Sequence, residues 1–144
     1  MEIRLIEQLG HVCLGTSKLK NMIDYYVKYC SCSISHEFIN QKDECYGVML
    51  RVATSSTFIE LFQDNGAHQV DRQAFRHLSF QVSDINEISS LLPDYGSKVE
   101  VCRGKTDRIL QCWHKDPDGN NVEFTQFDNL SLYKRKDTEI KKSL

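Results

Sequence analysis

The sequence predicts an α+β fold made of two βαβββ modules, because its two halves resemble each other. Residues 9–17 are similar to residues 75–83, and both stretches carry a histidine in a strand-like pattern. Residues 59–63 are similar to residues 122–126 at nearly the same spacing, and both carry a glutamate. Each module would therefore open with a histidine strand and close with a glutamate strand. We expect the two curled sheets to form a metal-binding cup.

Length and composition fit one ordinary domain with a real core. The chain has 144 residues, of which 40% are hydrophobic. The net charge of −2 and a pI near 6.2 do not indicate the basic surface that nucleic-acid binding requires. No apolar run approaches the ~20 residues that a membrane span needs, and the first residues lack the apolar region of a secretory signal. We therefore expect a soluble, cytoplasmic protein without nucleic-acid or membrane partners.

The cysteines match no disulfide-rich small scaffold. They are Cys13, Cys30, Cys32, Cys45, Cys102 and Cys112. The spacing of Cys30 and Cys32 differs from the Cys-x-x-Cys of zinc and redox motifs. A reducing compartment keeps such residues as thiols, so we expect neither disulfides nor a chemical role.

The first module begins with a strand and a helix. Residues 8–16 alternate in polarity, so Val12 faces one side of the strand and His11 faces the other, more polar side. Ser17 is predicted to cap a helix over residues 18–30, where apolar residues recur at helical spacing. This helix would cover the Val12 face.

Three more strands complete the first module. They are predicted at residues 32–39, 45–53 and 57–63. In the last of these strands Glu60 shares a face with Phe58 and Phe62, so its carboxylate lies among aromatic rings. A carboxylate in that setting is costly without a partner.

The second module repeats this order after a polar boundary at residues 64–74. Its elements are predicted at residues 75–82 (strand), 84–93 (helix), and 98–102, 108–115 and 120–127 (strands). Asp116-Pro-Asp-Gly119 is a strong turn signal, so residues 108–127 are expected to form a hairpin that delivers Glu123. His114 beside this turn is expected to be structural or exposed.

The domain limits follow from these elements. We expect a single domain at residues 1–127, with module one at about 8–63 and module two at about 75–127. Residues 128–144 are charged and only weakly periodic, which predicts a solvated tail.

Four residues at equivalent places in the two modules suit a metal ion. His11, Glu60, His77 and Glu123 lie on the predicted strand faces that point away from the helices. Two imidazoles and two carboxylates fit Zn²⁺, Ni²⁺, Co²⁺, Fe²⁺ or Mn²⁺, with coordination positions left open for water or substrate. Alternatively, each histidine is satisfied within its strand and each glutamate within a salt bridge. The repeat favours the shared metal site, because the alternative needs four independent coincidences.

These residues also carry a family resemblance. The motifs are Gly10-His11-Val12, Ile23-Asp24-Tyr25-Tyr26, Ile59-Glu60-Leu61, Arg76-His77-Leu78 and Asp116-Pro-Asp-Gly-Asn-Asn-Val-Glu123. Over residues 8–127 the chain resembles the vicinal oxygen chelate superfamily. That superfamily includes glyoxalase I, fosfomycin-resistance thiol transferases, methylmalonyl-CoA epimerase, extradiol dioxygenases and bleomycin-binding proteins. Its members share the metal cup and differ in chemistry.

Position 60 points within this superfamily to glyoxalase I. The resemblance implies that dioxygenases and fosfomycin enzymes lack a ligand there and that the epimerase has glutamine, whereas glyoxalase I has glutamate, as here. The implied reaction is that of a lactoylglutathione lyase, the isomerisation of a hemithioacetal of methylglyoxal and a thiol, with Zn²⁺ or Ni²⁺ as the expected metal. Glu123 is the implied base and Glu60 its partner. Both histidines would anchor the ion.

One position departs from the glyoxalase I pattern. Resemblance implies an arginine four residues after the first histidine that holds the carboxylate of glutathione, but this chain has Gly15 there. Other cations that could contact an anion are Arg51, Arg76, Arg103, Lys105 and Arg108. Each of them alone is expected to be a solvated surface charge.

Two other functions stay open at this stage. The chain could be another metalloenzyme of the superfamily, namely a thiol transferase, an epimerase or a ring-cleaving dioxygenase. It could also be a non-catalytic protein that binds a small molecule, as bleomycin-resistance proteins do. In all cases we expect a small-molecule partner and, by resemblance, a homodimer, with modules that pair within one chain or exchange between two.

Overall fold

Two four-stranded sheets, each accompanied by one helix, make up the described part of the chain, which confirms the predicted α+β fold and its two βαβββ modules. The structure is a computed structural model that describes residues 9–64, 75, 77–94 and 98–131. The chain divides into two compact units, Met1–Gln73 and Ala74–Leu144.

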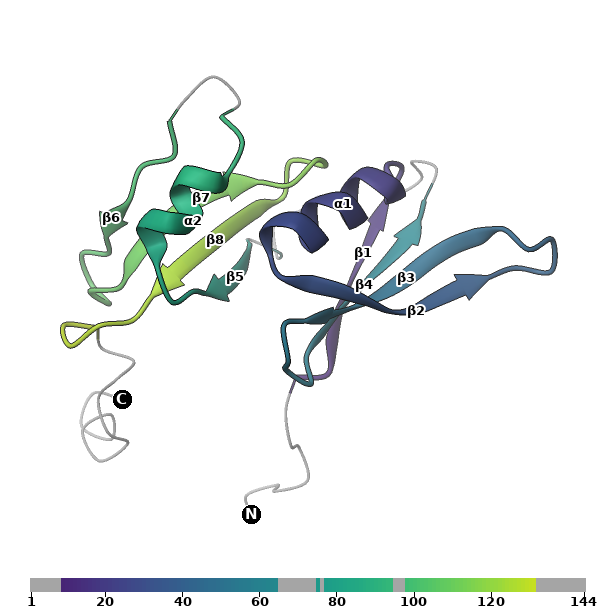
Figure 1. Ribbon diagram of the computed structural model, residues 1–144, viewed down its shortest axis with the longest axis horizontal. Coiled ribbons are helices and arrows are strands. Elements are labelled where there is room, and N and C mark those ends of the chain that lie inside the picture. The colour runs from purple at the N-terminus through teal and green to yellow at the C-terminus, as the bar shows by residue number, and fades with distance from the viewer. Residues whose placement is uncertain (1–8, 65–74, 76, 95–97, 132–144) are drawn as a thin grey trace, which may run out of the picture. The chain divides into compact units, whose positions relative to one another are not determined.

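Unit one contains β1, α1, β2, β3 and β4 in chain order (Figure 1). They span His11–Thr16 (β1), Leu19–Tyr29 (α1), Cys32–Ile39 (β2), Cys45–Val52 (β3) and Phe58–Gln63 (β4). The strand order in the sheet is β1-β4-β3-β2, with β1 parallel to β4 and the other neighbours antiparallel. The first and last strands of the module are therefore neighbours in the sheet.

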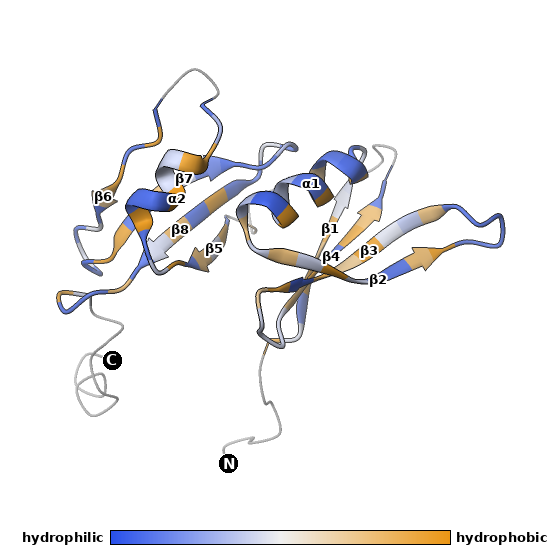
Figure 2. Cartoon of the chain, viewed as in Figure 1, coloured by the Kyte–Doolittle hydropathy of each residue, from blue (hydrophilic) through white to orange (hydrophobic). Residues whose placement is uncertain are grey.

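The core of unit one lies between α1 and one face of this sheet. Alternate residues of β3 and β4 are buried on this face, namely Val48, Leu50, Ile59 and Leu61. The helix contributes Leu19, Met22, Tyr25 and Tyr26, and Figure 2 shows hydrophobic segments in orange along β3 and β4. Burial of this apolar surface is the main favourable contribution to the stability of the unit. The intervening residues, including Glu60, face away from the helix.

The start of α1 differs from the prediction. Ser17 does not cap the helix; the N-cap residue is Lys18, which makes no side-chain capping hydrogen bond. Instead the hydroxyl of Thr16 accepts a hydrogen bond from the backbone N–H of Lys18 at 2.9 Å. Thr16 is buried and ends β1, so its side chain is already positioned to stabilise the turn into the helix.

Unit two repeats the order with β5, α2, β6, β7 and β8 (Figure 1). They span Leu78–Gln81 (β5), Ile85–Leu91 (α2), Cys102–Arg103 (β6), Leu110–Lys115 (β7) and Asn121–Gln126 (β8). The strand order is β5-β8-β7-β6, again with the first and last strands parallel. Its core includes Ile85, Cys112, Val122 and Phe124.

All four strands of unit two are shorter than predicted, and two of them differ most. The strand expected at 75–82 covers Leu78–Gln81, so His77 lies one residue before it. The strand expected at 98–102 is reduced to Cys102–Arg103, which pairs with β7 at only two positions. Alternating valines made residues 98–101 resemble a strand, but the segment borders two hollows instead of pairing along β7.

Three further expectations concern the cysteines, membranes and the tail. All six cysteines lie in described residues and none forms a disulfide. No helix in the described ranges combines the length and apolar character that crossing a membrane requires. At the start of the predicted tail, the hydroxyl of buried Ser131 accepts a hydrogen bond from the N–H of Asp128 at 3.0 Å. Residues 132–144 of the tail lie outside the described residues.

Candidate metal site

The first and last strands of unit one bring His11 and Glu60 together. In the parallel pairing of β1 with β4, Glu60 lies opposite Cys13, so His11 is its diagonal neighbour on the same face. His11 Nε2 is 3.7 Å from Glu60 Oε2. The side chain of His11 is 50% exposed, whereas that of Glu60 is only 15% exposed. The imidazole is therefore the partner that the partly buried carboxylate needs.

Unit two brings His77 and Glu123 together in the same way. Glu123 on β8 lies opposite Ser79 on β5, so His77 is again two residues before the residue that faces the glutamate. His77 Nε2 is 3.5 Å from Glu123 Oε2, and the glutamate side chain is 13% exposed. The internal repeat seen in the sequence thus extends to register, distance and burial.

Both pairs fit a divalent metal ion. Two donors that each lie about 2.1 Å from one ion at a tetrahedral angle are separated by about 3.4 Å. The measured separations of 3.7 and 3.5 Å match that value without rearrangement of either strand. A nitrogen and an oxygen from each unit give the mixed donor set that borderline ions accept.

Cys13 lies beside the first pair but does not resemble a third ligand. Partial desolvation raises the pKa of its thiol to about 11, and the hydrogen bond to Glu60 and the charge of Glu60 act in the same direction. Thiolates, rather than thiols, are the metal-binding form of cysteine. Cys13 is consequently a neutral neighbour of the Glu60 carboxylate.

No protein-family model and no curated protein matches the sequence. Solved structures do match. Leishmania major glyoxalase I, described as trypanothione-dependent, is 20% identical with a TM-score of 0.63, covering 84% of this chain and 87% of that one. A mutant of the fosfomycin resistance protein FosX from Listeria monocytogenes, solved with Mn(II) and dihydroxypropylphosphonic acid, is 12% identical with a TM-score of 0.63, covering 87% and 96%. TnmS3, an antibiotic-binding protein from Streptomyces sp. CB03234, is 17% identical with a TM-score of 0.66, covering 88% and 100%.

The chain has the vicinal oxygen chelate fold. Within this fold the two matched His–Glu pairs stand at the equivalent strands of the two βαβββ modules. Among the residues that the structure describes, no group of three or more His, Cys, Asp or Glu side chains lies close enough to hold a metal ion. Each unit taken alone therefore supplies two of the four predicted ligands.

Aromatic rings flank both pairs of this vicinal oxygen chelate fold. In unit two Trp113 lies opposite Glu123 in the β7–β8 pairing, and its ring centroid is 4.9 Å from that of His77. The position of Trp113 beside His77 and Glu123 was not predicted from the sequence. The Asp116–Gly119 turn could have identified it, because counting outward from the turn pairs position 113 with position 123. Trp113 is thus a cross-strand neighbour of Glu123 and contacts His77.

A larger aromatic cluster lies on the Glu60 face of unit one. The ring of Phe62 stacks on Tyr46 at 5.8 Å between centroids and contacts Phe38 at 5.0 Å. His36 lies at 4.9 Å from Phe38. Sequence alternation placed Phe62 on this face, but the contribution of β2 and β3 to the cluster depends on pairing register.

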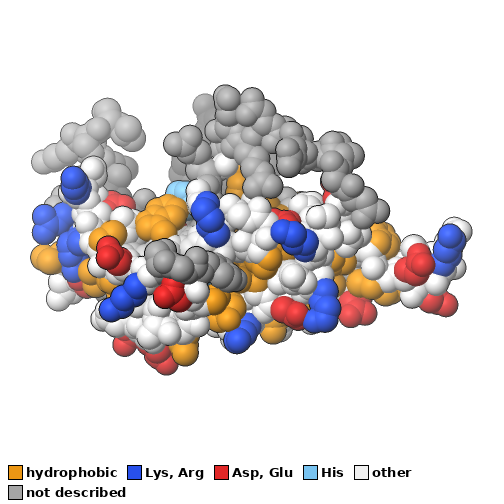
Figure 3. Space-filling view, turned by 90° about the horizontal axis from the view of Figure 1, so that it is seen from above, with side chains coloured by type: hydrophobic (Ala, Val, Ile, Leu, Met, Phe, Trp, Pro, Cys, Tyr) orange, Lys and Arg blue, Asp and Glu red, His pale blue; other side chains and the backbone are white. Residues whose placement is uncertain are grey.

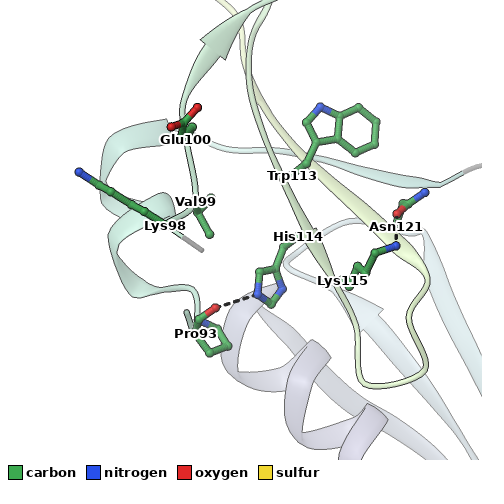
Figure 4. A pocket seen from close by; sticks show the side chains of 8 residues that line it. All are labelled: Pro93, Lys98, Val99, Glu100, Trp113, His114, Lys115 and Asn121. Atoms are coloured by element: carbon green, nitrogen blue, oxygen red, sulfur yellow. Dashed lines mark hydrogen bonds between the residues drawn. The ribbon is translucent and has the colours of Figure 1, made fainter. Parts of the chain in front are cut away.

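A pocket of about 650 Å³ opens beside β7 in unit two (Figure 4). It is lined by Pro93, Lys98, Val99, Glu100, Trp113, His114, Lys115 and Asn121. His114 is buried, and its Nε2 lies 3.0 Å from the carbonyl oxygen of Pro93, which makes it a structural residue as predicted. Trp113 lines this pocket and also contacts His77, whereas neither His77 nor Glu123 lines it.

Proposed function

We propose that the protein is a glyoxalase I-like, metal-dependent lyase that isomerises a hemithioacetal of methylglyoxal and a thiol. The observation that carries the proposal is the repeated His–Glu pair, with matching register and separations of 3.7 and 3.5 Å. The presence of glutamate at position 60 favours glyoxalase I chemistry over the other reactions of the superfamily. The shared fold with a glyoxalase I supports it.

In this proposal His11, Glu60, His77 and Glu123 bind one divalent ion, with Zn²⁺ or Ni²⁺ preferred. When bound, such an ion supplies Lewis-acid polarisation of substrate oxygens. The Nε2–Oε2 distances of 3.7 and 3.5 Å support binding of one ion by both members of each pair. The pairs can come from one chain or from two chains of a homodimer, because the donor set is the same in both cases.

Glu123 is the proposed general base. Its carboxylate is 13% exposed and lies opposite Trp113, so bulk water competes little for its oxygens. A glutamate oxygen takes the proton from the carbon that bears sulfur and returns it to the neighbouring carbon. The hydroxyl proton on the first carbon moves to the oxygen of the neighbouring carbonyl, so the hemithioacetal becomes a hydroxy thioester. Glu60 is the proposed partner in this proton movement.

The first experiment measures metal content in protein purified without added metal or a histidine tag. We expect close to one metal ion per chain, retained in Glu123→Gln, together with turnover of the methylglyoxal hemithioacetal that is lost in Glu123→Gln. A matched control is Glu37→Gln, which removes an exposed carboxylate on β2. If the purified protein contains no metal and takes up no Zn²⁺ or Ni²⁺, the proposal is wrong.

Two alternatives have their own support. The likeness to FosX favours another metalloenzyme of the superfamily, such as a thiol transferase, an epimerase or a dioxygenase. Oxygen uptake with catechols would select the dioxygenase. The likeness to an antibiotic-binding protein and the aromatic cluster of unit one favour a non-catalytic small-molecule-binding protein. If the protein has this function, the metal-free protein should bind an aromatic compound tightly.

We also propose a homodimer in the cytoplasm. Absence of disulfides among the six cysteines is the feature that fits a reducing compartment. Both acidic and basic side chains are present on the face in Figure 3. Mixing His11→Ala with His77→Ala chains tests the dimer arrangement, because activity returns only if modules exchange between chains.

A further inference from the structure

Strand β7 of unit two is covered along only part of its outer edge. β6 pairs with β7 only at Leu110 and Gln111, through Arg103 and Cys102. Residues 112–115 form an open edge of β7, since no strand in the described part of the chain pairs with them on this side. Such an edge presents backbone donors and acceptors that can pair with another chain.

The register shows which backbone groups point to the open edge. On the opposite side of β7, the backbone N–H of Asp116 donates to the carbonyl oxygen of Asn120 at 3.0 Å. In an antiparallel ladder such hydrogen-bonded pairs alternate with pairs that exchange no hydrogen bonds. His114 therefore bonds β8, whereas the N–H and C=O groups of Trp113 and Lys115 point away from β8. No described residue forms a hydrogen bond with these four backbone groups.

A pocket takes the place of a strand beside the open edge. Continued along β7, the register of β6 would put Glu100 opposite Trp113 and Lys98 opposite Lys115. Instead, residues 98–100 lie across the 650 Å³ pocket from β7 (Figure 4). One residue of a packed strand fills about 160 Å³, from a strand spacing of ~4.8 Å, a rise of ~3.4 Å and a layer thickness of ~10 Å. The pocket therefore has room for about four extended residues.

The side chains of the pocket walls suit one kind of peptide. The ring of Trp113 is 42% exposed, so a second aromatic side chain can pack on it. Lys98, Glu100 and Lys115 also line the pocket, and none of them forms an ion pair with a described residue. A hydrogen bond of 2.7 Å to Oδ1 of Asn121 holds the ammonium group of Lys115. The excess of lysine is complementary to an acidic side chain.

We propose that the open edge of β7 binds an extended peptide segment of a partner protein by strand addition, with an acidic residue opposite Lys115 and an aromatic residue opposite Trp113. In this mode main-chain hydrogen bonds supply affinity and alternate side chains supply specificity. The peptide residue between these two lies beside buried His114 and is apolar. None of the four proposed metal ligands lines the pocket, so the inference does not depend on the proposed reaction.

The test measures binding of a designed peptide to the full chain by fluorescence anisotropy. The peptide Val-Glu-Val-Tyr-Val, labelled with fluorescein through an N-terminal linker and amidated at its C-terminus, meets these requirements when it runs antiparallel to β7. We expect saturable binding that weakens about thirtyfold when the backbone N–H groups of its glutamate and tyrosine are methylated, as the loss of two ordinary hydrogen bonds allows. The matched control carries the same two methyl groups on the first and central valines, whose N–H groups point away from β7, and should keep most of the affinity.

Two variants at one position separate the backbone from the charge. Lys115→Pro removes an N–H group from the open edge without removing a hydrogen bond to β8. Lys115→Gln is the matched control, because it loses the same charge and keeps the N–H group. We expect Lys115→Pro to bind the peptide about tenfold more weakly than Lys115→Gln does. Thermal unfolding checks that both variants fold, and the methylated peptides decide on the wild-type chain if Lys115→Pro does not.

Amide hydrogen exchange shows what covers the edge. In the free protein we expect fast exchange at the N–H groups of Trp113 and Lys115 and slow exchange at that of His114. Bound peptide should slow the exchange of the first two groups. Slow exchange at both groups without peptide would mean that residues 98–101 or a second copy of the chain already pairs with β7, and the proposal would be wrong. Absence of saturable binding, or equal weakening by the two methylation patterns, would also overturn it.

Discussion

Gly47 on β3 is the residue that lets the aromatic cluster form on the Glu60 face. A Cβ atom there would lie 2.6 Å from Cε1 of Phe62 and 2.8 Å from the carbonyl oxygen of Leu61. The ring of Phe62 therefore lies directly over a strand that offers it no side chain. Gly47 also lies opposite Phe38 on β2, which completes the contact from the other strand. Because Gly47 has no Cβ atom, the ring of Phe62 has room to lie over β3.

Gly47→Ala should destabilise unit one by about 1–3 kcal/mol, the usual range for overpacking. The Phe62 ring can rotate away, but the Leu61 carbonyl belongs to the backbone and cannot. Urea denaturation measures the change. Gly10→Ala is the matched control, because a Cβ at Gly10 meets nothing within 4 Å. Equal stability of the two variants would contradict the packing argument.

Among elements, the two helices begin in physically different ways. Asp84 caps α2, and its Oδ1 accepts hydrogen bonds from the backbone N–H groups of Asn86 and Glu87 at 2.9 and 3.0 Å. At α1 the corresponding role is divided, since Lys18 is the N-cap residue and Thr16 provides the side-chain oxygen. Sequence signals for an N-cap identify a residue type near the boundary, but not which of two neighbouring hydroxyls has the required geometry.

Asp84→Ala should destabilise the protein by about 1 kcal/mol, because two N–H groups of the first turn of α2 lose their acceptor. Thermal or urea unfolding measures this change. Ser17→Ala provides the control and should have little effect, since Ser17 does not cap α1. A larger loss in Ser17→Ala than in Asp84→Ala would show that the capping assignment is wrong.

Side-chain contacts hold Arg103 at the end of the short strand β6. Arg103 Nη2 is 2.6 Å from Asp128 Oδ2, and Arg103 also donates to the carbonyl oxygen of Arg108. The hydrogen bond from Arg103 lowers the pKa of Asp128 well below its ordinary value near 3.8. Hydrogen bonding to Asp128 likewise raises the pKa of Arg103, which stays charged throughout.

This ion pair predicts a pH dependence. Because the pKa of Asp128 is lower in the folded chain than in the unfolded one, its contribution to stability is present above about pH 3.8 and is lost as the pH falls towards the lowered value. Asp128→Asn should therefore be less stable than the wild type at pH 7, and the difference should shrink below pH 3.8. Urea midpoints at pH 7 and pH 2 measure it. A difference that persists unchanged at pH 2 would rule out the charge of Asp128 as its cause.

The sequence predicted the elements that follow hydrophobic period and missed what depends on distant partners. The limits of β2 were predicted to the residue, and α1 to within one residue at each end, because their apolar spacing repeats. The short β6 could not be predicted, since Arg103 reaches Asp128, which is remote in the chain. Likewise, His11 and Glu60 could be assigned to one face from alternation, but their separation of 3.7 Å depends on the parallel register of β1 with β4.

At the scale of the whole molecule, the proposed four-residue metal site would need one His–Glu pair from each unit. Each βαβββ unit pairs its first strand with its last and thereby places one histidine beside one glutamate. Two donors hold an ion weakly, whereas four give the coordination that borderline ions favour. The surroundings of the two pairs have diverged, with Trp113 in unit two and the Phe38–Tyr46–Phe62 cluster in unit one. The two units thus carry the same pair of residues, one histidine and one glutamate, but differ in the aromatic side chains around them.

A shared ion makes a prediction that two separate ions do not. If one ion takes both pairs as ligands, His11→Ala and His77→Ala should each abolish metal uptake, and the double variant should be no worse. If each pair held its own ion, each single variant would keep half of the metal. The matched control is His36→Ala, which removes a histidine of the aromatic cluster and should leave the metal content unchanged.

Metal content of the wild type and the four variants by mass spectrometry distinguishes these cases, and unfolding with and without Zn²⁺ provides a second measurement. An ion that binds only the folded chain stabilises it by about 2.7 kcal/mol when its free concentration is about 100 times Kd. We expect that gain in the wild type and in His36→Ala, and none in either single ligand variant. Half the gain in each single variant would mean that the units act separately, and the proposed four-residue site would then be wrong.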